Sequence, residues 1–301
     1  MGTWQGMDMP FDPAELPTGQ LMQISPLVGR VLAPNPSPYT WTGTQSYIVG
    51  HGDVAVIDPG PDDPAHIDAL MAAIAGRPVL AIMATHTHRD HSPGTRPLAV
   101  ATGAPIIGCA PLFMDDSGPR ADAAFDRDYG PDRVMQDGEA LAGEGWTLRA
   151  IATPGHISNH LCYALGEEKA LFSGDHVMGW STSVVAPPDG NMGDYMRSLD
   201  LLMGRDDSIY YPAHGDPITD PRRLVRGMMG HRKQREGQIL RFIGANGAAP
   251  IPAMVAAMYK GLDPRLHRAA GQSVLAHLID LADRDIVAEG QDGWRLIAAV
   301  Q

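Results

Sequence analysis

Four side chains able to bind a metal ion fall within six consecutive positions, in the run THTHRDH at residues 85–91. Alternate side chains of an extended segment point the same way, so His86, His88 and Asp90 can converge. His91 joins them if the chain then turns into the helix that we predict from Gly94. Histidines and a carboxylate crowded in this way repel one another when protonated unless something organises them. The run therefore predicts a metal site, with ligand distances of about 2.0 to 2.2 Å.

Further candidate ligands stand in short motifs downstream. His156 ends the motif TPGH, Asp175 ends SGD, and His214 lies in PAHG. Taken singly, Asp175 has a second interpretation as a turn residue, and His214 as a core histidine. The chain has only two cysteines, Cys109 and Cys162, which excludes Cys-rich zinc patterns and disulfide frameworks. Any metal must therefore be held by histidines and carboxylates.

In this order the motifs resemble those of the metallo-β-lactamase superfamily, whose signature THxHxDH matches residues 85–91. The turn DPG, which begins at Asp58, is a fifth match, and the resemblance covers roughly residues 45–216. It implies that His86, His88 and His156 hold one metal ion and that Asp90, His91 and His214 hold a second. It further implies that Asp175 bridges the two ions together with a water or hydroxide, and that Asp58 supports the metal loop.

Two such cations acidify the bridging water, so that hydroxide is available near neutral pH, and polarise the bond to be cleaved. Asp90 is our candidate to orient this nucleophile and carry its proton. The ligands suit two zinc ions, with iron or manganese as alternatives. By resemblance, Asp175 separates the chain from the secreted zinc β-lactamases, which usually lack it, and favours the thioesterase, lactonase and ribonuclease branches.

Three weaker candidates lie near these motifs: His160, His176 and Tyr195. We predict that they contact substrate. The alternative is that each histidine bonds a neighbouring carboxylate or carbonyl group and that Tyr195 packs on its helix.

The motifs need a scaffold of short strands and helices. Apolar runs bounded by Gly, Pro or Asp predict strands at 46–49, 54–57, 79–83, 105–107, 147–151, 161–164, 170–172 and 208–211. Helical spacing of apolar residues predicts helices at 64–75, 94–101 and 192–202. Strands mixed with helices indicate an α/β fold in layers. The resemblance implies the four-layer αββα metallo-β-lactamase sandwich.

The chain changes character after His214. A long Arg-rich helix is predicted at 221–243, then a break, GANGAAPIP, then helices at 253–260 and 267–283 and a hairpin of 286–289 with 294–298. This order is that of a small winged-helix-like module. We expect an N-terminal arm at 1–20, the metal domain at 21–243 and the module at 244–301.

The segments SGDHVMGWSTSV, DYMRSLDLL, YYPAHG and HRKQREGQIL resemble the beta-lactamase-like protein 2 branch of the superfamily, and the tail resembles its winged-helix domain. That branch includes an endoribonuclease that acts on single strands. His176 departs from its animal members, which carry Cys there.

The distribution of charge along the chain helps to choose between a small-molecule substrate and a nucleic acid. The formal net charge is −12, and residues 1–216 hold 11 Lys and Arg against 27 Asp and Glu, whereas residues 217–301 hold 12 against 8. The acidic body argues against a phosphate-binding surface. Seven basic residues in the tail are either a solvated helix face or an RNA-tracking strip. They are Arg222, Arg223, Arg226, Arg232, Lys233, Arg235 and Arg241.

We rank first a hydrolase of a small ester, lactone, thioester or β-lactam, second an endoribonuclease on single-stranded RNA bound through the basic tail, and last a winged-helix DNA-binding regulator. A small-molecule substrate is thus the expected partner.

The N-terminus lacks a basic segment followed by an apolar one, and apolar runs fall short of the roughly 20 residues of a membrane helix. We expect a cytoplasmic enzyme away from membranes, with the long helix or the N-terminal arm available for a homodimer.

Overall fold

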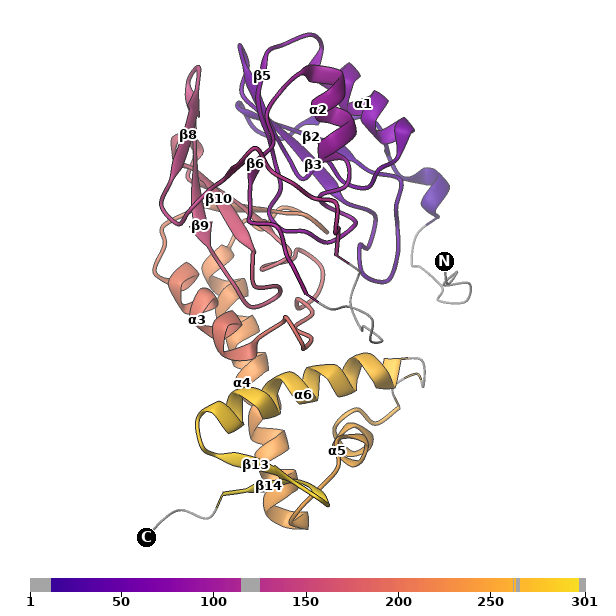
Figure 1. The fold of residues 1–301 in the computed structure, drawn as a ribbon, viewed down its shortest axis with the longest axis vertical. Coiled ribbons are helices and arrows are strands. Elements are labelled where there is room, and N and C mark those ends of the chain that lie inside the picture. The colour runs from indigo at the N-terminus through magenta and orange to yellow at the C-terminus, as the bar shows by residue number, and fades with distance from the viewer. Residues whose placement is uncertain (1–11, 115–124, 262, 264–265, 298–301) are drawn as a thin grey trace.

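The computed structural model describes residues 12–114, 125–261, 263 and 266–297, and two five-stranded sheets form its centre (Figure 1). The first sheet has the order β1-β2-β3-β4-β5, which are Leu21–Gln23, Val28–Leu32, Gln45–Val49, Val54–Ile57 and Val79–Met83. The second has the order β12-β11-β10-β9-β8, which are Ile209–Pro212, Ala170–Gly174, Leu161–Leu165, Trp146–Ala152 and Ala140–Gly143. A small parallel pair, β6 (Ile107–Gly108) and β7 (Arg133–Val134), lies beside them.

The central strands of both sheets are covered on both faces. Every residue of β3, β4, β10 and β11 is buried, which explains why most of their residues are apolar instead of alternating with polar ones. Between the sheets lies a core that includes Tyr47, Met83, Leu148, Tyr163 and Phe172. This shared core fixes the two sheets against each other.

Helices cover the outer face of each sheet. On the first sheet, α1 (Pro64–Ile74) and α2 (Thr95–Thr102) bury a cluster that includes Ile48, Leu70 and Leu98. On the second, α3 (Met192–Met203) and α4 (Pro221–Asn246) bury one that includes Leu171 and Leu199. The layer order is helix, sheet, sheet, helix, so the predicted αββα sandwich is confirmed (Figure 1).

The remaining elements form a small module below the sandwich in Figure 1. They are α5 (Ile251–Met258), α6 (His267–Asp283), β13 (Val287–Gly290) and β14 (Gly293–Leu296). Their core also takes in Ile239 and Ile243 from the end of α4, whereas Val225 and Met228 of the same helix pack on the second sheet. The boundary that we predicted after Ile243 therefore falls inside a continuous helix, and the break between helices is only residues 247–250.

Most expected elements appear within a few residues of their predicted ends, and the exceptions have physical reasons. Our sequence analysis predicted no strands at β1, β2, β7 and β8. Strand β1 is exposed along its length, β7 spans only two residues, β8 has Leu141 as its one large apolar residue, and Gly29 and Arg30 interrupt the apolar pattern of β2. Of the predicted N-terminal arm, residues 1–11 lie outside the described part, as does Ala298 of the predicted hairpin. Among the described residues no helix is both long and apolar enough to span a bilayer.

Candidate metal centre

Each predicted ligand follows directly or closely on the end of a strand. The run 85–91 follows β5, His156 follows β9, Asp175 follows β11 and His214 follows β12. Strands β9 and β11 are each antiparallel to β10, and β12 is parallel to β11, so the ends of β9, β11 and β12 meet at one edge of their sheet. Topology thereby collects ligands that lie far apart in the sequence.

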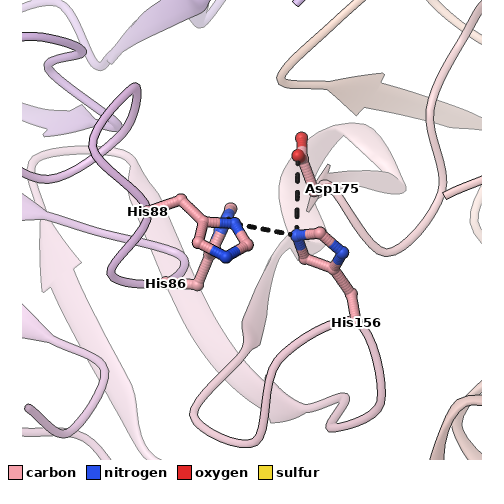
Figure 2. Close-up of side chains that lie close together, drawn as sticks. All are labelled: His86, His88, His156 and Asp175. Carbon is pink, nitrogen blue, oxygen red and sulfur yellow. Dashed lines mark hydrogen bonds and ion pairs between the residues drawn. The ribbon is translucent and has the colours of Figure 1, made fainter. Parts of the chain in front are cut away.

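The first group of side chains is His86, His88, His156 and Asp175, shown in Figure 2. Nδ1 of His88 lies 3.0 Å from Nε2 of His86 and 3.0 Å from Nε2 of His156. Nε2 of His156 lies 3.7 Å from Oδ2 of Asp175. The four potential ligand atoms all lie within 4.8 Å of one another, and all four residues are buried. The three imidazoles and the carboxylate can therefore serve one cation.

The second group is Asp90, His91, His214 and again Asp175. Oδ2 of Asp90 lies 3.4 Å from Nε2 of His91 and 3.2 Å from Nε2 of His214. Oδ1 of Asp175 faces the same two nitrogens, at 3.6 Å from His91 and 3.3 Å from His214. Asp175 thus directs one carboxylate oxygen to each group, the arrangement that a bridging ligand requires.

Hydrogen bonds hold the outer nitrogens of these imidazoles. Nδ1 of His156 lies 2.5 Å from the carbonyl oxygen of Val184, and Nδ1 of His214 lies 3.1 Å from that of Gly43. Such bonds leave Nε2 as the ligand atom and fix the ring plane. Our sequence analysis missed both carbonyl groups, and no sequence signal marks them because every residue has a backbone carbonyl.

Asp58 contacts both ends of the run 85–91, the loop that the resemblance implied it would support. One oxygen accepts from the backbone nitrogen of Thr85, and the other lies 3.1 Å from Nδ1 of His91. Asp58 sits in the left-handed region with φ of 48°, which places its carboxylate under the end of β5. The hydroxyl of Thr85 also donates to Asp58 at 2.8 Å.

The chemistry of these donors fits metal ions. Nε2 of His91 and of His214 and Oδ1 of Asp175 are buried, and none has a hydrogen-bond partner within the described chain. Burial alone would lower the pKa of His91 and of His214, but facing carboxylates, including Asp90 and Asp175, raise both. The space between these groups therefore favours positive charge, which a bound cation would supply.

The other protonation states are also those that metal binding needs. Burial, followed by the neighbouring imidazoles of His91 and His88, holds the pKa of His86 well below its ordinary value, so this ring is neutral. Burial would raise the pKa of Asp90, but His91 and His214 hold it well below the ordinary value. The site therefore presents a neutral imidazole beside an ionised carboxylate.

Gly174, directly before Asp175, cannot gain a side chain unless two neighbouring side chains move. Its φ is 50°, and a Cβ there would lie 2.6 Å from Nε2 of His160 and 2.8 Å from the hydroxyl of Thr85. Strand β11 can therefore deliver Asp175 this close to the loop only because residue 174 lacks a side chain.

The three weaker candidates lie behind the candidate ligands and are buried. His160 is buried, with Nδ1 at 2.8 Å from the hydroxyl of Thr153 and Nε2 accepting from the backbone nitrogen of Asp175. His176 is buried against the ring of Tyr195, with 4.6 Å between the ring centroids. Tyr195 is fully buried and donates its hydroxyl to the carbonyl of His176, which favours the packing alternative over the predicted contact with substrate.

The basic residues of α4 do not form one free strip. Arg222 donates to the carbonyl of Arg205, and Arg232 is buried and donates to the carbonyl of Ser183. Arg235 donates to the side chain of Gln238. The exposed members of the seven are Arg222, Arg223, Arg226, Lys233 and Arg241.

Comparison with known proteins places this geometry in a family. Residues 39–214 match the model of the metallo-beta-lactamase superfamily, and residues 251–294 match that of the beta-lactamase associated winged helix domain. The second match covers the elements α5, α6 and β13 and the start of β14.

Similar proteins include fungal proteins of comparable length. The chain is 34% identical to an atrochrysone carboxyl ACP thioesterase of Aspergillus chevalieri, over 74% of this chain and 68% of that protein. It is 28% identical to the lactamase-like protein ptaB of Pestalotiopsis fici, over 94% of this chain and 90% of that one. A beta-lactamase domain protein of Burkholderia ambifaria shares the fold with a TM-score of 0.74, at 20% identity over 94% of this chain and 95% of that one.

Proposed function

This chain belongs to the metallo-beta-lactamase superfamily and carries the winged-helix domain associated with it, and on that basis we propose that it is a dinuclear, zinc-dependent hydrolase of an acyl thioester. The position of Asp175 supports this proposal most directly, since its two carboxylate oxygens face two separate groups of ligands. A site for a single ion would not need the two oxygens of one carboxylate to face different groups of side chains.

We assign His86, His88 and His156 to the first ion and Asp90, His91 and His214 to the second, with Asp175 between them. When bound, two such ions would acidify a water near neutral pH and supply positive charge for the oxyanion that develops at the carbonyl group. Mixed imidazole and carboxylate ligands suit zinc, with iron and manganese as the alternatives that elemental analysis would distinguish.

Asp90 is the residue that we propose handles the proton. Its Oδ2 faces His91 and His214, whereas its Oδ1 is buried and has no hydrogen-bond partner in the described chain. This oxygen is available to orient the attacking water and to accept its proton. Attack forms a bond from oxygen to the acyl carbon, the bond from carbon to sulfur breaks, and Asp90 returns the proton to the leaving sulfur. The products are a carboxylic acid and a thiol.

We choose a thioester over an ester, lactone or β-lactam because of the activities for which two similar proteins are named. The relative from Aspergillus chevalieri is named a thioesterase that acts on an acyl group carried by an ACP. A further relative at 34% identity, from Paecilomyces divaricatus, has the same activity in its name. The endoribonuclease that we ranked second, the DNA-binding regulator, the homodimer and the cytoplasmic location remain predictions, and the internal bonds of Arg222 and Arg232 leave fewer cations free for RNA.

A hydrolysis panel on protein of known metal content tests the proposal. The panel comprises an acyl pantetheine thioester, a lactone, a β-lactam and single-stranded RNA, each assayed with the native chain and with His86→Ala. We expect about two metal ions per native chain, release of thiol from the thioester, and loss of that activity in the variant. Hydrolysis of RNA or lactam with an inert thioester would contradict the proposal, as would one metal ion or none in the active protein.

A further inference from the structure

A cavity of about 450 Å³ lies between the metal domain and the winged-helix module. Residues 181–185 form one wall, and α4 contributes His231, Arg232 and Arg235. Tyr259, Ala270 and Ser273 close it from the module. No acidic side chain is among the described residues that line it, although the metal domain as a whole is acidic. The cavity is therefore a local concentration of positive charge.

Arg232 is the strongest sign that this cavity takes a ligand. Its residue is only 4% exposed, and it donates from Nη2 to the carbonyl oxygen of Ser183. Its Nε is buried without a hydrogen bond, and no described carboxylate lies within ion-pair distance of the guanidinium. A buried charge is costly unless an opposite charge or a full set of hydrogen bonds compensates it. An anion in the cavity would provide that compensation.

Arg235 and His231, which also line the cavity, likewise have buried nitrogen atoms without a hydrogen bond in the described chain. Arg235 stacks over the ring of Tyr259, with Cζ 4.4 Å from the ring centroid, and its Nε is also buried without a hydrogen bond. Nδ1 of His231 is buried without a partner in the described chain as well. Burial, and then the charges of Arg232 and Arg235, lower the pKa of His231. The two arginines therefore disfavour a third positive charge on this ring.

One wall of the cavity is also a wall of the metal centre. The carbonyl of Val184 holds Nδ1 of His156, and the hydroxyl of Ser183 donates to the carbonyl of His176. The side chains of Val184, Val185 and Ala270 line the cavity with apolar surface. The cavity and the candidate ligand His156 therefore lie against the same short segment, residues 183–185.

We propose that the cavity binds a negatively charged group of the substrate, a phosphate or a carboxylate, through Arg232 and Arg235. This inference rests on the proposed thioesterase function and narrows the substrate to thioesters that carry a negative charge away from the reacting carbonyl. The charge has two sources: a phosphate on the thiol portion, as in phosphopantetheine, or a carboxylate on the acyl portion.

Three matched thioesters separate these sources: S-butyryl pantetheine, S-butyryl 4′-phosphopantetheine and S-succinyl pantetheine. A charge-assisted hydrogen bond contributes about 1.5 to 3 kcal/mol, or roughly 10- to 100-fold. We expect one charged thioester to exceed the neutral one in kcat/KM by about tenfold or more, mainly through KM. A preference for the phosphate assigns the charge to the thiol portion, and a preference for succinyl assigns it to the acyl portion.

Arg235→Gln should reduce this preference to within about twofold, and Arg235→Lys should restore part of it because the charge returns. Arg235 is chosen over Arg232 because the latter also holds Ser183. The matched control is Arg241→Gln, an exposed arginine on the same helix that does not line the cavity. It should leave the preference as in the native protein.

Binding of thioethers tests the cavity without hydrolysis. S-methyl 4′-phosphopantetheine and S-(3-carboxypropyl) pantetheine are titrated against S-methyl pantetheine by calorimetry, on native protein and on Arg235→Gln. Tighter binding of a charged thioether that depends on Arg235, with every thioester inert, would support the anion site while refuting the thioesterase.

Three results would overturn the inference. The first is thioester hydrolysis with no charge preference and no difference among the thioethers. The second is a preference that persists in Arg235→Gln, because the charge would then be bound elsewhere. The third is Arg235-dependent binding of a single-stranded RNA oligonucleotide when neither charged thioether binds.

Discussion

Asp58 accepts two hydrogen bonds from Thr85, one from the backbone nitrogen at 2.7 Å and one from the hydroxyl at 2.8 Å. These bonds join the end of β4 to the end of β5, where the metal loop begins. Since Asp58 also contacts His91, one buried carboxylate sets both the start of the loop and a ligand near its end.

Asp58→Ala should therefore weaken metal binding without removing a ligand. Loss of a group that orients a ligand commonly costs about 10- to 100-fold in metal affinity or activity. Metal content after dialysis against increasing chelator measures the effect. The control is Asp68→Ala, an exposed carboxylate on α1. Equal retention of both metal ions by the two variants would show that Asp58 does not support the site.

Asp90→Asn separates proton transfer from metal binding. The amide keeps an oxygen that can face His91 and His214 but cannot accept the proton of the attacking water. We expect kcat to fall by about 10² to 10⁴ at saturating metal. Turnover and metal content are measured on the same sample, with the exposed Asp62→Asn as control. Native turnover with a full metal complement would remove Asp90 from its proposed role.

Gly174→Ala tests whether close approach at the end of β11 is needed. A Cβ there would lie 2.6 Å from His160, whereas at Gly138, which also has a positive φ, a Cβ would meet nothing within 4 Å. Gly138→Ala should lower the free energy of unfolding by about 1 kcal/mol, the cost of the left-handed backbone alone. Gly174→Ala should cost about 1 to 3 kcal/mol more, the range for overpacking, and should lower activity. Chemical denaturation and the thioester assay compare them.

His277 predicts a loss of stability in acid. It is buried on α6, and burial, then the charges of Arg232 and other neighbours, lowers its pKa to about 3. The unfolded chain takes up this proton near pH 6.5, and the folded one only near pH 3. The free energy of unfolding should therefore fall as pH decreases between these values, by at most about 1.4 kcal/mol per pH unit from this group.

His277→Leu, which cannot titrate, should flatten that slope relative to the native protein. Urea denaturation at several values of pH gives both slopes, and their difference isolates His277 from the metal ligands, which titrate in both proteins. Parallel slopes would show that His277 does not take up its proton on unfolding.

The cluster at residues 85–91 and most of the central strands could be predicted from local sequence because both have local signals, whereas His156, Asp175 and His214 were assigned by the resemblance of their motifs to the family. The run 85–91 places four donors within six residues, and the buried strands are continuous apolar runs. Burial on both faces favours apolar residues throughout such strands, so the sequences of β4 and β5 are easy to interpret.

Features that depend on packing between distant segments had no such signal. Tyr195 lies on a helix and carries a polar group, and its local sequence does not show that its hydroxyl donates a hydrogen bond to the carbonyl of His176. Arg232 was one of seven similar cations in the sequence, and only the folded chain shows that it is buried beside Ser183. The exposed strand β1 escaped notice because it has little apolar patterning.

The continuity of α4 makes the winged-helix module sensitive to the phase of the helix. Met228 packs on the metal domain and Ile239 packs in the module, with uninterrupted helix between them. One residue inserted between these positions would rotate everything downstream by about 100° and advance it by about 1.5 Å. A chimera that takes the module from a relative must therefore keep the same number of helical residues between these two positions.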